Sequence, residues 1–315
     1  MSYPIELQAP DIAAYKHGNT GVDYVHRFDS GQAGPHVCVN AVMHGNEICG
    51  AIALDHLFKA KLRPKRGVLS LCFVNVDAFL SFDPQAPGES RFVDEDMNRV
   101  WVEERLDSSE RTAELDRARA LRPIFDSVDY LLDIHSMSTL SEPILLCNGL
   151  ATERALARNM TYPRTVACGS GHIVGKRLIE YTPFNDPGND KTALLIECGQ
   201  HWARDAAPAA LDTALYFLRA LDMLPDGFFE AHVATAEPAA QQMLDVTHGY
   251  TTKTEHFEFA QTFVGLEEFA DENTLIATDG ADEIRTPYPR CVLVMPHAVK
   301  ERNRRVLRFA RHSER

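Results

Sequence analysis

Residues 36–62 read HVCVNAVMHGNEICGAIALDHLFKAKL, and this stretch decides the expected fold. Its first part, HVCVNAVM, is a short apolar run of the kind that forms a buried strand. From Asn46 onward the chain has the length and composition of a helix. A buried strand that leads into a helix is the repeating unit of a parallel sheet.

Similar strand-like runs recur along the first two thirds of the chain. They are GVLSLCFVNV (67–76), YLLDIHS (130–136), EPILLCN (142–148) and TALLIECG (192–199). Helices are expected over 108–126, opening at a cap on Ser108 or Ser109, and over 205–224. Apolar runs separated by helices predict an α/β fold, with a mostly parallel mixed sheet flanked by helices.

The last third of the chain has a different pattern. Short segments rich in Thr, Phe, Tyr and Val are separated by Gly, Pro and Asp-Gly turns. We therefore expect two domains, a catalytic α/β domain over 1–228 and a smaller β-rich domain over 229–315.

Charge and composition limit the function classes. The 315 residues are 45 % hydrophobic, enough for a sizeable core, and the net charge of −13 opposes binding to nucleic acid or to an anionic membrane. The basic stretch KERNRRVLRFARHSER (300–315) is expected to be a solvated C-terminal segment, with a nucleic-acid arm as the alternative.

The N-terminal sequence and the spacing of the cysteines indicate where in the cell the protein is expected. The N-terminal sequence lacks a targeting pattern, and no apolar run is long enough to span a bilayer. The seven cysteines are dispersed without a CxxC pair, which is typical of reduced thiols in a protein core. The sequence therefore predicts a soluble, cytoplasmic protein, with a homo-oligomer left open.

Three residues are candidate metal ligands. His44 and Glu47 lie three residues apart where a strand gives way to a helix, so we expect them on one face of the first helical turn. His135 follows another apolar run, and the carboxyl ends of strands meet in one crevice of an open α/β sheet. Asp133 and Ser136 are candidate outer partners of that histidine. Each residue taken alone is better explained by a structural role.

A carboxylate and an arginine-rich loop add chemistry to this site. Glu197 ends an apolar strand, where an acid is costly to bury unless it is paired or functional, so it is either a general base or half of a structural salt bridge. The loop SRFVDEDMNRVW (90–101) contains Arg91, Asn98 and Arg99. Its arginines could bind a carboxylate or an oxyanion, or could pair with the acids of the same loop.

Four motifs in this order resemble one family of enzymes. HGNE (44–47), RFVDEDMNR (91–99), LLDIHS (131–136) and LLIECG (194–199) together resemble the succinylglutamate desuccinylase/aspartoacylase family, part of the zinc carboxypeptidase clan. The resemblance covers roughly 35–200 and implies a zinc-carboxypeptidase-like fold.

The resemblance also implies roles for individual residues. His44, Glu47 and His135 correspond to the ligands of one Zn²⁺ per subunit, and Glu197 to the glutamate that activates the water at the metal. Arg91 corresponds to the arginine that polarises the scissile carbonyl. The pair that holds the substrate carboxylate corresponds to Asn98 and Arg99.

The expected activity is hydrolysis of the linear amide bond of a small N-acyl amino acid. A metallocarboxypeptidase acting on short peptides and a non-catalytic metal- or ligand-binding homologue are the alternatives. Relatives that act on N-acetylaspartate carry an arginine about ten residues before the catalytic glutamate, where this chain has Pro187. Arg177 and Lys191 are near that position but out of register, so neutral or basic amino-acid side chains are expected to be preferred.

Overall fold

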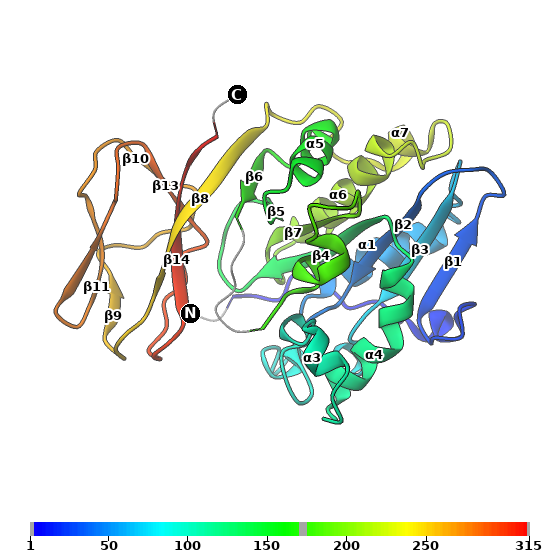
Figure 1. The fold of residues 1–315 in the computed structure, drawn as a ribbon, viewed down its shortest axis with the longest axis horizontal. Helices are drawn as coiled ribbons and strands as arrows, with labels where there is room; N and C mark the ends of the chain where they lie inside the picture. Colours follow the sequence, from blue (N-terminus) through cyan, green and yellow to red (C-terminus); the bar gives the residue numbers. More distant parts are fainter. Residues whose placement is uncertain (1–2, 170–174, 314–315) are drawn as a thin grey trace.

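The computed structural model describes residues 3–169 and 175–313. A mixed sheet of 11 strands runs through the molecule, and a separate three-stranded antiparallel sheet lies at one end (Figure 1). Helices flank the large sheet on both faces, which confirms the predicted α/β class.

The spatial order of the strands in the large sheet differs from their order in the sequence. From edge to edge they are β1 (Val25–Asp29), β3 (Val68–Phe73), β2 (His36–Ala41), β4 (Tyr130–Met137), β7 (Thr192–Gln200), β5 (Ile144–Cys147), β6 (Thr165–Cys168), β8 (Gln242–Thr251), β14 (Arg305–His312), β13 (Cys291–Val294) and β10 (Glu268–Phe269). The small sheet contains β12 (Asp282–Arg285), β11 (Leu275–Asp279) and β9 (Phe257–Phe259).

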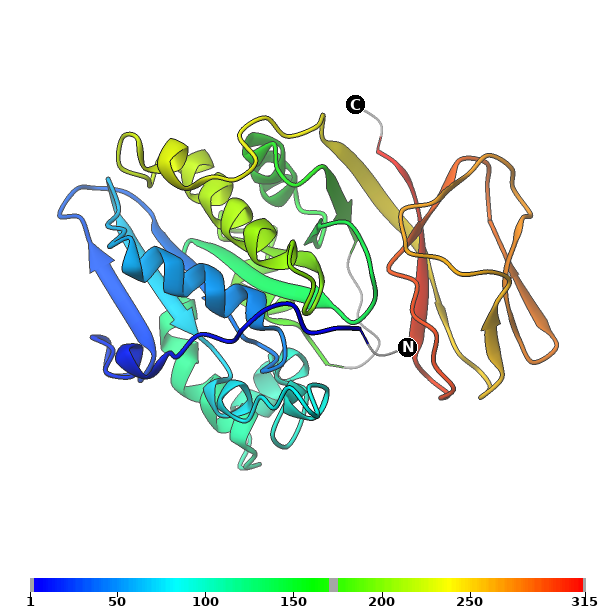
Figure 2. The same ribbon diagram turned by 180° about the vertical axis from the view of Figure 1, so that it is seen from behind.

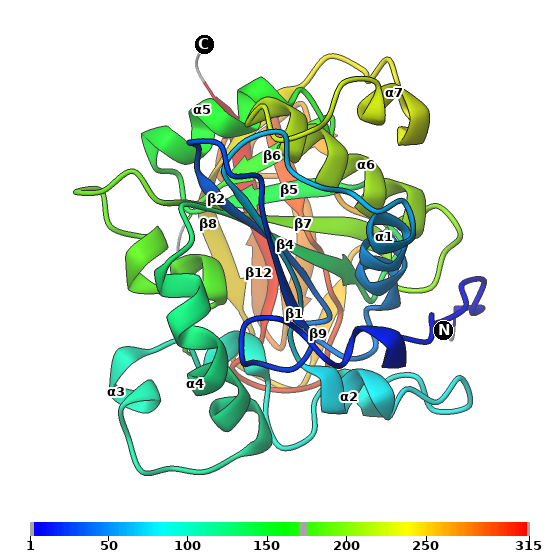
Figure 3. The ribbon, with the colours of Figure 1, turned by 90° about the vertical axis from the view of Figure 1, so that its right-hand side faces the viewer.

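The centre of the large sheet is parallel. Strands β3, β2, β4 and β7 run in one direction, and β5 is antiparallel to β7. Every residue of β2 is buried, because helices cover both of its faces (Figure 3). This double burial explains why these strands appear in the sequence as continuous apolar runs.

Two helical layers complete the core. The helices are α1 (Ile48–Lys59), α2 (Val76–Leu80), α3 (Glu103–Leu106), α4 (Ala113–Asp126), α5 (Ala151–Met160), α6 (Ala206–Ala220) and α7 (Phe228–His232). Helices α1 and α6 pack against one face of the sheet (Figure 2). On this face, Ile134 of β4 and Ile196 of β7 belong to the same apolar cluster as the two helices. Helix α4 covers the other face, where Leu131 and Leu195 point.

Two local predictions about helix starts were wrong. Thr112, not Ser108 or Ser109, caps α4, since its hydroxyl accepts a hydrogen bond from the N–H of Leu115. The helix after HGNE begins at Ile48, so His44 and Glu47 precede it and do not share a helical turn.

The basic C-terminal stretch is also different from the expectation. Residues 305–312 form β14, which lies inside the large sheet between β8 and β13 and is not a solvated tail. Buried apolar residues decide this, because the pairs Val306–Leu307 and Phe309–Ala310 are buried between the arginines.

The C-terminal strands continue the large sheet. Strand β8 pairs in parallel with β6, so the sheet runs without a break past residue 228. The division into domains over 1–228 and 229–315 remains a prediction. Among the described residues, no helix has the length and apolar character needed to cross a bilayer.

Candidate metal centre and active site

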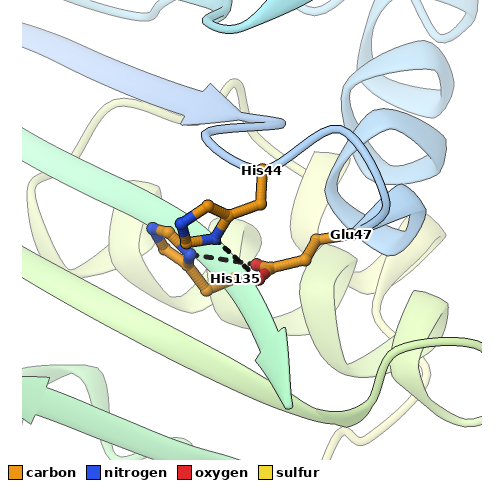
Figure 4. Close-up of side chains that lie close together, drawn as sticks. All are labelled: His44, Glu47 and His135. Carbon is orange, nitrogen blue, oxygen red and sulfur yellow. Dashed lines mark hydrogen bonds and ion pairs between the residues drawn. The ribbon is translucent and has the colours of Figure 1, made fainter. Parts of the chain in front are cut away.

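His44, Glu47 and His135 meet at the carboxyl ends of β2 and β4 (Figure 4). The Nδ1 atom of His44 lies 2.7 Å from Glu47 Oε1, and the Nδ1 atom of His135 lies 2.9 Å from Glu47 Oε2. All three side chains are buried, and their ligand atoms lie within 4.8 Å of one another. The structure thus brings together the three residues predicted from the sequence.

The loop between β2 and α1 is shaped by a close approach at Gly45. A Cβ atom there would lie 2.2 Å from the backbone carbon of Ala78 and 2.4 Å from the carbonyl oxygen of Ser90. Only glycine therefore fits at this position. The N–H of Glu47 donates to the carbonyl of His44, which closes a tight turn and directs both side chains to one point.

Each histidine has a carboxylate on its outer nitrogen. His135 Nε2 lies 2.9 Å from Asp133 Oδ2, as expected for an outer partner, and His44 Nε2 lies 2.9 Å from Asp96 Oδ1. Such partners orient the ring and leave the other nitrogen for a metal. Two imidazoles and a carboxylate suit zinc or a similar divalent ion, so the residues present fit a metal site.

The opposite charges of the cluster shift the pKa values of its members. Burial would raise the pKa of Glu47, but His44 and His135 hold it well below its usual range. Burial would likewise lower the pKa of His135, but Asp133 and Glu47 raise it well above its usual value. Ser136, the other candidate outer partner, donates its backbone N–H to Glu47 Oε2 at 3.0 Å.

Glu197 lies beside the cluster on the next strand. It is the register partner of His135 between β7 and β4, and its side chain emerges on the same face as Leu195. Among the described residues, its buried Oε2 atom has no hydrogen-bond partner. Burial first, and then the charge of Glu47, raises the pKa of Glu197 to about 8. Such a carboxyl group exchanges protons near neutral pH.

The arginine-rich loop closes over the cluster. Arg91 Nη1 lies 3.3 Å from Glu47 Oε1, and Arg91 Nη2 lies 3.4 Å from Asp96 Oδ2. Its side chain is 34 % exposed, so the guanidinium borders solvent as well as the buried ligands. The pairing of arginine with an acid of its own loop thus occurs here together with contact to a candidate ligand.

Asn98 and Arg99, which follow in the same loop, make different contacts. The Nδ2 atom of buried Asn98 lies 3.5 Å from His135 Nε2, and its Oδ1 accepts a hydrogen bond from the N–H of Leu178. Arg99 Nη1 donates to the Asn98 carbonyl at 2.6 Å. Both residues therefore border the metal cluster.

Sequence reasoning missed the residue that holds this loop. The carboxylate of Glu114, in the first turn of α4, accepts hydrogen bonds from the backbone N–H groups of Val93, Asp94 and Glu95. Glu114 is fully buried. A glutamate just after the Thr112 cap gives the sequence no sign of this role, because its partners lie about 20 residues earlier.

Arg177, Lys191 and Pro187, the positions considered for a second contact to an anionic substrate, lie in different surroundings. Arg177 forms an ion pair with Glu180 at 3.0 Å and acts electrostatically on Glu197. Lys191 instead donates to the carbonyl of Val128 at the opposite ends of the strands. Pro187 lies in the loop before β7.

Comparison with known proteins supports the same assignment. A family model described as the succinylglutamate desuccinylase/aspartoacylase catalytic domain matches residues 33–216. No protein among the curated sequences matches the chain.

Solved structures share the fold. Succinylglutamate desuccinylase from Vibrio parahaemolyticus is 14 % identical with a TM-score of 0.67, covering 93 % of this chain and 87 % of its own. The ectoine utilization protein EutE from Ruegeria pomeroyi is 15 % identical with a TM-score of 0.64, covering 94 % and 92 %. A succinylglutamate desuccinylase/aspartoacylase from Rhodobacter sphaeroides is 17 % identical with a TM-score of 0.64, covering 90 % and 87 %. With the catalytic-domain match and the His-Glu-His cluster, the chain belongs to the succinylglutamate desuccinylase/aspartoacylase family of deacylating hydrolases.

Proposed function

We propose that this protein is a zinc-dependent amidohydrolase that releases the acyl group from a small N-acyl amino acid. One observation carries the proposal: the His-Glu-His cluster has a second carboxylate, Glu197, in register beside it, and the Oε2 atom of Glu197 has no hydrogen-bond partner among the described residues. A metal-binding protein without catalysis would not need that second acid. The absence of a partner for Glu197 Oε2 among the described residues also argues against a structural salt bridge.

The metal would be held by His44, Glu47 and His135. When bound, zinc supplies a Lewis acid that polarises a carbonyl and makes water more acidic. Asp96 and Asp133 hold the outer nitrogens of the two histidines and fix their ring orientation.

Glu197 is the proposed general base and acid. Its raised pKa lets the carboxylate take a proton from the attacking water and return it to the leaving amine. The parallel pairing of β4 with β7 fixes this carboxylate beside His135. The proposed proton transfer would therefore take place next to a candidate metal ligand.

The arginines are proposed to bind the two charged parts of the reacting molecule. Arg91 borders Glu47, so its guanidinium can stabilise the oxyanion that develops on the scissile carbonyl. Arg99 and the amide of Asn98 would hold the α-carboxylate of the amino acid, the first by a charge-assisted contact. This positions the amide bond between Arg91 and Glu197.

The C-terminal strands favour small substrates over peptides. His297, in the segment between β13 and β14, lies with Nδ1 3.5 Å from the hydroxyl of Ser138, just beyond the end of β4. Burial and the charges of Arg304 and Arg91 lower the pKa of His297, so this segment lies near the arginine of the site. A segment at this place restricts a long peptide more than a single amino acid.

A substrate screen tests the proposal against its alternatives. The zinc-loaded protein is assayed with N-acetyl and N-succinyl amino acids beside short unblocked peptides, and its metal content is measured. Release of free amino acids from the acylated series is expected. Cleavage of peptides alone would instead indicate a carboxypeptidase, and failure to bind any divalent metal would reject the mechanism. The cytoplasm remains the proposed location, supported by the seven free, buried cysteines.

A further inference from the structure

Arg308 is a partly buried arginine without an acidic partner. It lies on β14, paired with Gly249 of β8 and Val294 of β13. Its side-chain contact is with the sulfur of Met295, 3.9 Å from Nη1. Among the described residues no carboxylate lies within ion-pair distance of it, although removing a guanidinium from water is costly unless a counter-charge compensates.

The strand directs Arg308 toward the catalytic side of the molecule. Its neighbours Leu307 and Phe309 pack into the core that faces the small sheet. Arg308 alternates with them and contacts Met295, which packs instead against the apolar cluster that contains Met137 at the end of β4. Met137 is two residues beyond His135, so Arg308 faces the carboxyl ends of the strands that carry the site.

Electrostatics agree with this placement. Burial, followed by the charges of Arg177 and Arg305, lowers the pKa of Arg308 to about 10, and Glu197 opposes them. Arg99 contributes to the same lowering. Arg308 is therefore close enough to both the proposed base and the proposed carboxylate-binding arginine to feel their charges.

The neighbouring arginines differ in how they are compensated. Arg177 pairs with Glu180, and Arg99 has Asp96 at 3.9 Å. Arg308 has no such acid among the described residues, so its own positive charge is left without a counter-charge. A guanidinium in this state provides a bidentate contact for a planar anion.

We propose that Arg308 is a specificity-determining residue that binds a second carboxylate of the substrate. The favoured N-acyl amino acid is then a dicarboxylate, with one carboxylate on Arg99 and the other on Arg308. The second carboxylate belongs either to a dicarboxylic acyl group or to an acidic amino-acid side chain. This inference rests on the proposed function and replaces the preference for neutral or basic substrates expected from Pro187.

Two matched pairs of substrates test the proposal and separate its two sources. N-acetylaspartate is compared with N-acetylasparagine, and N-succinylalanine with N-butanoylalanine. The wild-type enzyme is expected to favour the dicarboxylate at least about tenfold in kcat/KM in one pair, which identifies the carboxylate that Arg308 binds. Arg308→Met should lower kcat/KM for that dicarboxylate about 10- to 100-fold, mainly through KM, since a charge-assisted contact is lost. The neutral partner should change less than about twofold.

The matched control is Arg311→Met. It removes the same charge from an exposed position on the same strand and should leave both kcat/KM values unchanged. Equal losses for the dicarboxylate and neutral substrates in Arg308→Met, or no wild-type preference in either pair, would overturn the role of Arg308. If Arg308→Met does not fold, Arg308→Gln is measured, and an unchanged preference there also overturns it. No hydrolysis of any acylated substrate would reject the proposed function itself.

Discussion

His135 on β4 and Glu197 on β7 face each other in register across two adjacent parallel strands. Their side chains therefore leave the sheet on the same face, the one covered by α4 and by the arginine-rich loop. The pairing of the two backbones therefore holds a candidate metal ligand beside a candidate proton acceptor. This arrangement gives the site a rigid base, since the central strands are buried on both faces.

Removing the proposed base should stop turnover without releasing the metal. Glu197→Gln is expected to lower kcat about 10²- to 10⁴-fold, the usual contribution of a general base, while zinc content stays at one per chain. Steady-state kinetics and metal analysis of the same preparation check this. Glu142→Gln, at an exposed position, is the control. Near-native turnover of Glu197→Gln with saturating zinc would show that another group accepts the proton.

Removing a candidate ligand should release the metal as well as stop turnover. His135→Ala is expected to lose both zinc and activity, because only Glu47 and His44 of the cluster remain. Elemental analysis after dialysis against a weak chelator measures the loss. His256→Ala, at an exposed histidine in the C-terminal segment, should retain full occupancy. Equal zinc content in the two variants would place the metal elsewhere.

The base should also destabilise the metal-free protein at neutral pH. The folded carboxyl of Glu197 has a pKa of about 8, whereas its ordinary value is 4.5. Between these values the unfolded chain has lost a proton that the folded protein keeps, so stability falls as pH rises through this window. After chelation, Glu197→Gln should therefore have a higher Tm than wild type, by a margin that grows from pH 4.5 to 8 and is then constant. A margin independent of pH would contradict this linkage.

The support of the arginine-rich loop can be tested at Glu114. Glu114→Gln replaces an accepting oxygen by a donor and leaves a partly buried backbone N–H of the loop without its acceptor, so the free energy of unfolding should fall by about 1 kcal/mol. The loop that carries Arg91 and Asp96 should loosen, and kcat should fall with it. Urea denaturation and kinetics measure the two effects. Glu104→Gln, exposed and nearby, should alter neither, and normal activity of Glu114→Gln would show that the loop holds itself.

Much of the fold was readable in the sequence because its signals are local. The apolar runs that became β2, β3, β4 and β7 are strands buried on both faces, and burial of this kind demands continuous apolar residues. Short elements such as β1 and β6 were not predicted. Neither VHRFD of β1 nor TVAC of β6 contains an apolar run as long as ILLC, which made the equally short β5 recognisable.

The sequence by itself determined the α/β class, the three candidate ligands and the candidate base, since each of these residues lies in or just after an apolar run within a recognisable motif. Only the tertiary structure decided that Asp96 holds His44, that Glu114 holds the loop, and that the basic C-terminal stretch is an inner strand carrying Arg308 toward the site. The physical reason is the same in each case. These contacts join residues far apart in the chain, and neither side-chain period nor charge along the chain specifies which strand or carboxylate will be the partner.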